Sequence, residues 1–173
     1  MPYWIMIFNQ NPLGLFSGES LLAAITSSNY HTLCDQYGLD PDLIQPTLAQ
    51  LSLEMSRGSG LPYFLLRYQP QHQPPIVVTR WDALIGAGRQ YLLGFAENPV
   101  SANMRDYLMS TRELVTVELV EAQLFDLGLL LAYEIARWAA AVGSGVMYGL
   151  DGFWYGLNAH HAFVPLADQV NYP

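Results

Sequence analysis

The chain has 173 residues, of which fifteen are acidic and seven are basic, so its net charge at pH 7 is −8. A negative surface repels phosphate backbones and anionic headgroups, so we expect neither nucleic-acid nor membrane binding. All seven basic residues are Arg, and without lysine the chain can form no Schiff base, P-loop or Ser–Lys dyad.

Hydrophobic residues make up 51% of the chain and charged residues 13%, against roughly 25% charged in an average soluble domain. The charged residues are too few to cover the surface, so we expect exposed apolar area. Such area favours self-association or binding to a protein partner.

The single Cys34 cannot form an internal disulfide, which favours a reducing cytoplasm. We expect a cytoplasmic, bacterial protein. The first eighteen residues carry no charge, but Asn9–Pro12 interrupts them and no basic segment precedes them. The apolar segment 124–142 contains two acids and an arginine, which are costly inside a bilayer.

Residues that alternate between apolar and polar predict strands, and apolar residues three and four apart predict helices. In chain order we expect a strand at 3–8, a helix from Ser17 to Tyr37, a helical turn from Asp40-Pro41, strands at 51–55, 63–68 and 76–79, a helix capped by Asp82, a brief helix at 101–108, a strand at 115–119, a helix at 123–141 and a hairpin of strands 146–148 and 153–155. The β-α-β-β-β-α-β-α-β-β order predicts one α+β domain over 1–173, with a mainly antiparallel sheet and helices packed on it. Residues 162–173 are expected to form an irregular tail.

The helix predicted at 123–141 is strongly apolar and is expected to lie centrally against the sheet. Its polar residues Gln123, Asp126, Glu134 and Arg137 fall within a stripe of roughly 80°. A carboxylate held by Arg137 in a cleft would suit proton transfer or binding of a polar ligand. The simpler interpretation is that the stripe is the solvent-facing edge of the helix.

Histidine and cysteine give only weak candidates for chemistry. His160 and His161 are adjacent, so on an extended chain they point to opposite sides, and His72 lies far away. We therefore expect no metal site and interpret the pair as surface residues. His31 and Cys34 are three residues apart, but a buried structural cysteine is the simpler interpretation.

The glycine motifs do not match those of cofactor or nucleophile loops. Gly86 and Gly88 follow a strand, but Tyr91 stands where a dinucleotide loop needs its third glycine. Close packing of a helix on the sheet explains this pair better, and no cofactor is expected. Gly143-Ser144-Gly145 lacks the spacing of a nucleophile elbow and is typical of a helix stop.

The predicted C-terminal hairpin is rich in aromatic residues, and Tyr148, Trp154 and Tyr155 are its candidate binding residues. Such residues are frequent at interfaces, and the hairpin edge could pair with another strand. The simpler interpretation is one buried face and one ordinary surface.

The sequence resembles no family closely enough to name one. It favours a non-enzymatic interaction module, either a homo-oligomer or an acidic inhibitor or immunity-type protein that masks a basic partner. The alternative is a small-molecule-binding protein or enzyme that uses Asp126, Glu134 and Arg137.

Overall fold

The computed structural model describes residues 2–27, 30, 34, 35, 38–58, 61–69, 71–97 and 101–166. The predicted α+β fold is confirmed, with an eight-stranded antiparallel sheet in the order β2-β3-β4-β5-β1-β6-β7-β8. The strands are β1 (Tyr3–Asn9), β2 (Ser52–Gly58), β3 (Leu61–Arg67), β4 (Ile76–Asp82), β5 (Glu113–Leu119), β6 (Gly145–Tyr148), β7 (Trp154–Leu157) and β8 (Phe163–Pro165). The helices are α1 (Gly18–Thr26), η1 (Pro41–Leu43), α3 (Ile44–Leu48), α4 (Gly86–Glu97), α5 (Ala102–Met109), η2 (Glu121–Phe125) and α6 (Leu127–Gly143).

The first strand lies at the centre of the sheet. It pairs with β5 over seven residue pairs, from Tyr3 with Leu119 to Asn9 with Glu113, and with β6 on its other side. Because side chains alternate between the faces of a strand, this pairing assigns odd-numbered residues of both strands to one face and even-numbered residues to the other.

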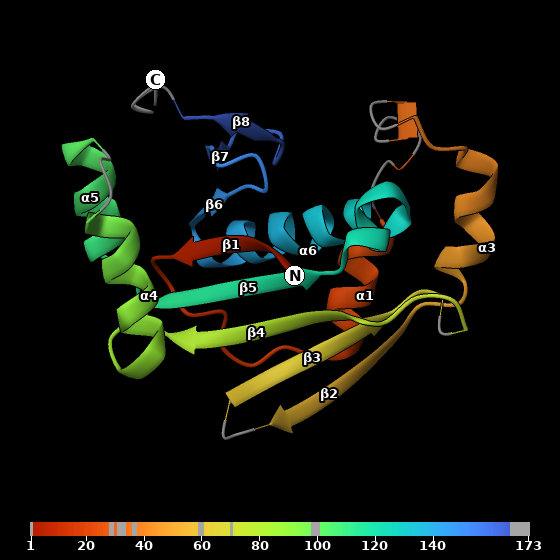
Figure 1. The fold of residues 1–173 in the computed structure, drawn as a ribbon, viewed down its shortest axis with the longest axis horizontal. Helices are drawn as coiled ribbons and strands as arrows, with labels where there is room; N and C mark the ends of the chain where they lie inside the picture. The colour runs from red at the N-terminus through yellow and green to blue at the C-terminus, as the bar shows by residue number, and fades with distance from the viewer. Residues whose placement is uncertain are drawn as a thin grey trace.

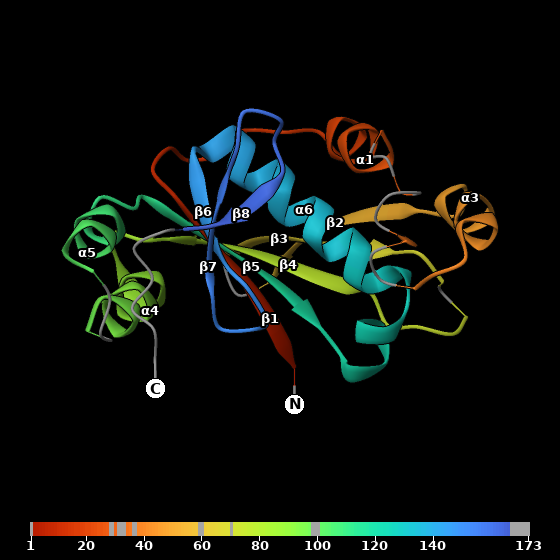
Figure 2. The ribbon, with the colours of Figure 1, turned by 90° about the horizontal axis from the view of Figure 1, so that it is seen from above.

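Helices α6 and α1 cover the first face of the sheet (Figures 1 and 2). The larger core lies between them and the sheet and includes Ile5, Ile7, Val115, Val117, Leu130 and Ile135. The prediction of a central apolar helix is confirmed, since α6 contacts β1, β5 and β6.

Helices α4 and α5 cover only one end of the second face. A smaller core there includes Met6, Phe8, Leu92, Leu108 and Leu114. Over the rest of that face, no helix of the described chain lies in front of β1, β5, β4 and β3, which turn this side toward the viewer in Figure 1. The sheet is therefore buried on both faces at one end and open on one face at the other.

The predicted helix starts are confirmed at Ser17, Asp40 and Ser101, whose side chains accept backbone N–H groups of the first turn. The start predicted at Gln123 is wrong. Asp126 has extended backbone and caps α6, and Gln123 lies in the separate η2. A continuous helical stripe from 123 to 137 therefore does not exist.

The two glycines expected to end the central helix also make room for a neighbour. A Cβ on Gly143 would lie 2.2 Å from the Asn9 side chain, and one on Gly145 would lie 2.1 Å from it. Asn9 is fully buried at the end of β1. Close packing against β1 therefore requires glycine here, in addition to the stop signal.

Two further predictions are corrected. The helix expected to follow Asp82 directly begins only at Gly86, and Leu84 and Ile85 before it are exposed. Asp82 accepts the Leu84 N–H (2.8 Å) in a turn, so it is not the helix cap. The tail expected to be irregular from 162 contains β8, which pairs with β7 and covers the edge expected to be open; residues 167–173 lie outside the described part.

A buried ion pair binds the segment between β1 and α1 to the sheet. Arg80 on β4 donates through Nε (2.7 Å) and Nη2 (2.6 Å) to Glu113 Oε1 on β5. Glu113 Oε2 accepts the Leu13 N–H (2.8 Å), and Arg80 Nη1 donates to the Gly14 carbonyl (2.9 Å). The guanidinium also lies over the Phe16 ring, 5.5 Å from its centre.

Arg80→Met is expected to lower the free energy of unfolding by about 3 kcal/mol, because it leaves the Glu113 carboxylate buried without its cation. Arg67→Met is the control, since the Arg67–Glu54 pair is longer (3.5 Å) and more exposed, and its loss should cost less than about 1 kcal/mol. Urea unfolding of both variants measures the difference. Equal losses would contradict the structural role given to Arg80.

Two glycines within α4 provide a second test. A Cβ on Gly88 would lie 2.2 Å from the Asp82 carbonyl oxygen, whereas one on Gly94 meets nothing within 4 Å. Gly88→Ala should therefore destabilise the protein by about 2 kcal/mol through overpacking. Gly94→Ala should stabilise it by up to about 1 kcal/mol through helix propensity. Thermal unfolding would refute the packing if both variants moved the midpoint in the same direction.

Candidate functional site

The structure does not bring the three predicted polar residues together. Glu134 and Arg137 form an ion pair (2.6 Å) on consecutive turns of α6. Asp126 lies eight residues before Glu134, about 12 Å along a helix axis. Glu134 is buried, so the interpretation as a solvent-facing edge is also wrong at this residue.

The surroundings of Glu134 are those of a core residue. The Tyr30 hydroxyl is buried near it and donates to the Ile25 carbonyl. The pKa of Tyr30 is raised well above its usual range, first by burial and then by the negative charge of Glu134. The ion pair thus lies near Tyr30, which follows α1, a helix that contacts α6.

Asp126 has a small cavity of its own. Its Oδ1 accepts the Gly128 N–H (2.7 Å) and the Tyr68 hydroxyl (2.9 Å). The cavity, of about 180 Å³, is lined by Gly38, Leu39, Leu124, Phe125, Asp126, Leu129 and Leu130. Burial raises the pKa of Asp126, and hydrogen bonds from Gly128, Tyr68 and Gln73 partly oppose that rise.

The histidine pair lies in the turn between β7 and β8, where Asn158 Oδ1 accepts the backbone N–H of His160 (2.8 Å) and Ala162 (3.0 Å). Both histidines are exposed. The described residues contain no group of three His, Cys, Asp or Glu side chains placed to hold a metal ion. Cys34 is fully buried, and His31 lies outside the described residues.

The three aromatic residues of the hairpin separate onto two faces. Tyr148 and Trp154 contact each other with tilted rings (4.9 Å between ring centres) on the second face. Trp154 is buried in the smaller core. Tyr155 packs against the larger core and donates from its hydroxyl to Asp151.

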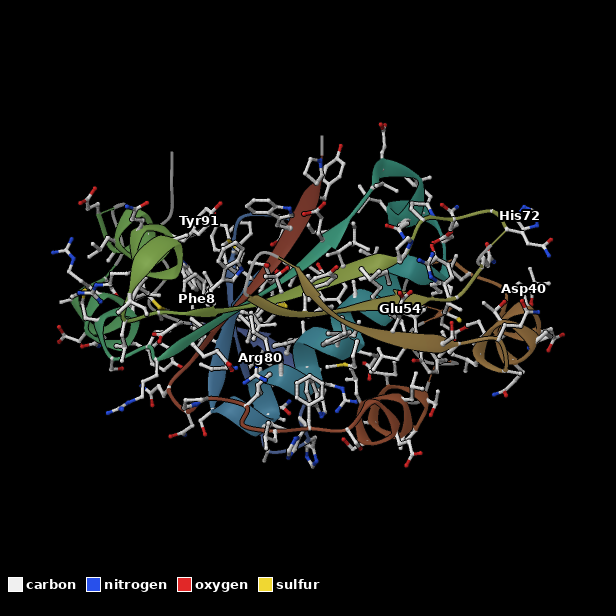
Figure 3. All side chains as sticks on the ribbon, turned by 90° about the horizontal axis from the view of Figure 1, so that it is seen from below. Phe8, Asp40, Glu54, His72, Arg80 and Tyr91 are labelled. Atoms are coloured by element: carbon white, nitrogen blue, oxygen red, sulfur yellow. The ribbon has the colours of Figure 1, made fainter. Side chains whose placement is uncertain are left out.

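A different set of aromatic residues lies on the uncovered part of the second face. We call this surface the open sheet face; its residues are Trp4, Tyr63, Leu65, Val77, Thr79, Trp81, Thr116 and Glu118, placed on one side by the strand registers. Tyr91 of α4 borders it and extends from the helix toward β1 (Figure 3).

Three rings of this surface hold one another in position. Tyr91 meets Trp4 and Trp81 edge-on, with ring centres 6.1 Å and 5.6 Å apart. The indole N–H of Trp4 donates to Glu118 Oε2 (2.9 Å), and that of Trp81 donates to Thr116 Oγ1 (3.1 Å). Trp4 and Tyr91 each remain 37% exposed. The rings are therefore fixed in orientation while part of their surface faces solvent.

A pocket of about 440 Å³ opens along the same side of α4. It is lined by Ala87, Gln90, Tyr91, Gly94 and Phe95, which are spaced to share one helix face. Phe95 continues the aromatic contacts to Tyr148 (5.0 Å) and Trp154 (5.9 Å). Two of the predicted binding residues thus lie behind this pocket.

Sequence reasoning did not find this surface. Trp4 lies on a predicted strand. Trp81 lies just beyond the strand predicted at 76–79, which extends to Asp82 in the structure. The sequence does not show that β1 pairs with β5 or that β5 pairs with β4. The sequence feature that could have indicated this surface is the presence of four tryptophans in a chain with few charges. A buried indole N–H group needs a hydrogen-bond partner, so tryptophans are frequent where an apolar surface meets polar groups.

Comparison with protein-family models, with curated proteins and with solved structures finds no match for this chain. Among the described residues, no helix has both the length and the apolar character needed to cross a membrane.

Asp126→Asn tests the environment of the small cavity. Asn keeps the cap and still accepts from Tyr68, but it does not titrate. Because the folded pKa of Asp126 is raised, the wild type loses stability as pH rises from the ordinary carboxyl pKa through the raised value. The free energy of unfolding of Asp126→Asn relative to wild type should therefore increase between pH 3 and about 7, measured by urea unfolding. A constant difference across that range would contradict the raised pKa.

Proposed function

We propose that this protein is a non-enzymatic interaction module that binds a protein partner through the open sheet face. The observation that carries the proposal is the set of three mutually fixed, partly exposed rings, Trp4, Trp81 and Tyr91, beside the 440 Å³ pocket. Aromatic side chains that are held rigid before binding lose little entropy on association and dominate interface energies.

The chemistry of this surface favours binding over catalysis. Its polar groups are Glu118, Thr116, Thr79 and the Tyr63 hydroxyl, and its pocket adds Gln90. No histidine or cysteine is among these residues, so they include no nucleophile with an adjacent general base. Apolar area with a few polar groups is typical of an interface core.

Charge favours a partner of a different kind over a second copy of the chain. The net charge is −8, and the open sheet face carries Glu118 near its aromatic residues. In a twofold-symmetric dimer the same patch meets itself, which would bring the negative surfaces together. An acidic inhibitor-type protein, acting in the cytoplasm on a basic partner, fits the charge better.

The alternative of a small-molecule site is less well supported. The cavity at Asp126 has a volume of about 180 Å³, below the usual range of roughly 300–1,000 Å³ for ligand pockets. Its carboxylate is already used as a helix cap. Glu134 and Arg137 lie elsewhere and do not add to it.

Gly94→Trp tests the proposal, because an indole there would fill the pocket, and the position has open space for its Cβ. The amount of a protein that co-purifies with the tagged wild type from its native host should fall at least tenfold with this variant. Leu43→Trp is the matched control, since it adds the same ring at an exposed residue (69%) of η1, far from α4 in Figure 1. Equal recovery with both variants would refute the surface assignment.

Light scattering on the same variants separates the two kinds of partner. The proposed heterologous binder should be a monomer on its own in all three forms. A wild-type dimer that Gly94→Trp dissociates would instead make the open sheet face a self-association surface.

A further inference from the structure

From the open sheet face we infer the chemistry of its partner: a basic protein segment that places an arginine side chain on Trp4 and Glu118, with apolar residues on either side of it. This inference rests on the proposed function and narrows it to one kind of ligand.

Glu118 is a carboxylate in an apolar row of the sheet. It lies directly opposite Val77 of β4 and Trp4 of β1, and it is half-buried. The ion pairs of the described residues are Arg67 with Glu54 and two buried pairs elsewhere, so none of them neutralises Glu118.

The one hydrogen bond to Glu118 fixes its position without neutralising it. Trp4 Nε1–H donates to Oε2, which holds the carboxylate at the edge of the indole ring. The other oxygen, Oε1, has no hydrogen bond from a described residue and can accept from a partner. A neutral donor leaves the full negative charge in place, and a half-buried charge is stabilised when a cation approaches it from outside.

The adjacent indole makes this position selective for a cation with a flat, weakly hydrated head. A guanidinium group stacks on an indole face, and tryptophan is the best of the rings for this contact. The same group can donate to a carboxylate at the ring edge. Val77 and Leu65 continue the row away from Glu118, so apolar neighbours of the arginine would lie on apolar strand residues.

Glu54, a carboxylate just beyond the open sheet face, gives an internal comparison. Glu54 lies in the same row on β2, beyond Leu65 and Val77, and pairs with Arg67. Its charge is thus already partly neutralised, and it is distant from Tyr91 in Figure 3. Of these two carboxylates, Glu118 is the one with no ion pair among the described residues and with an adjacent indole ring.

The test titrates the full chain with two peptides, N-acetyl-Leu-Arg-Leu-amide and the same peptide with citrulline in place of arginine. Citrulline keeps the shape of the side chain and removes its charge. The indole N–H resonance of Trp4, assigned with Trp4→Phe, reports binding at this position. The arginine peptide should shift this resonance and bind about tenfold more tightly than the citrulline peptide.

Glu118→Gln should remove most of the tenfold difference, leaving only the contact with the Trp4 ring, while Glu54→Gln should leave the tenfold difference unchanged. Glutamine at position 118 still accepts from Trp4, and the Glu54–Arg67 pair is long and exposed, so both variants should stay close to the wild-type unfolding midpoint. The inference would be overturned if the two peptides bound wild type equally, or if both variants lost the same affinity for the arginine peptide. It would also be overturned if the Trp4 resonance did not shift at the highest peptide concentration that stays soluble.

The same variants distinguish this inference from the function on which it rests. If Gly94→Trp releases the captured partner and Glu118→Gln does not, the proposed interaction surface is supported, but the inferred arginine contact at Glu118 is wrong. If Gly94→Trp retains the partner, the proposed surface itself is wrong, whatever the peptides do.

Discussion

The pairing of β1 with β5 is the constraint on which the other features depend. It joins residues more than a hundred positions apart along the chain and places the first strand in the middle of the sheet. Seven pairs in one register leave no freedom in which face each side chain occupies, because a shift of one residue would reverse them all. Ile5 and Ile7 therefore face α6, and Trp4, Met6 and Phe8 face the other side.

Helix length then decides how much of the second face is covered. The seventeen residues of α6 extend across the first face, whereas α4 has twelve residues and α5 eight. These two shorter helices pack at one end of the sheet (Figure 2). The apolar residues beyond them remain at the surface, in agreement with a composition that has too few charges to cover it.

Two ion pairs lie inside the fold, and Glu118 differs from both. The Arg80–Glu113 and Arg137–Glu134 pairs are neutralised within the fold, one between strands and one along α6. Such buried pairs are costly to break and contribute to a unique arrangement of the elements they join. Glu118 belongs to neither pair and accepts a hydrogen bond from the neutral Trp4 indole.

The sequence by itself determined the fold class, most of the strands and three helix caps, because these depend on local periodicity and on side chains that bond to the nearest turn. It did not locate the start of α6, since Asp126 fits a helical stripe as well as a cap, and it missed β8, which is too short to show alternation. Only the tertiary structure decided the open sheet face. Trp4, Trp81 and Tyr91 come from three distant segments, and strand pairing and helix packing, which are non-local, bring them together.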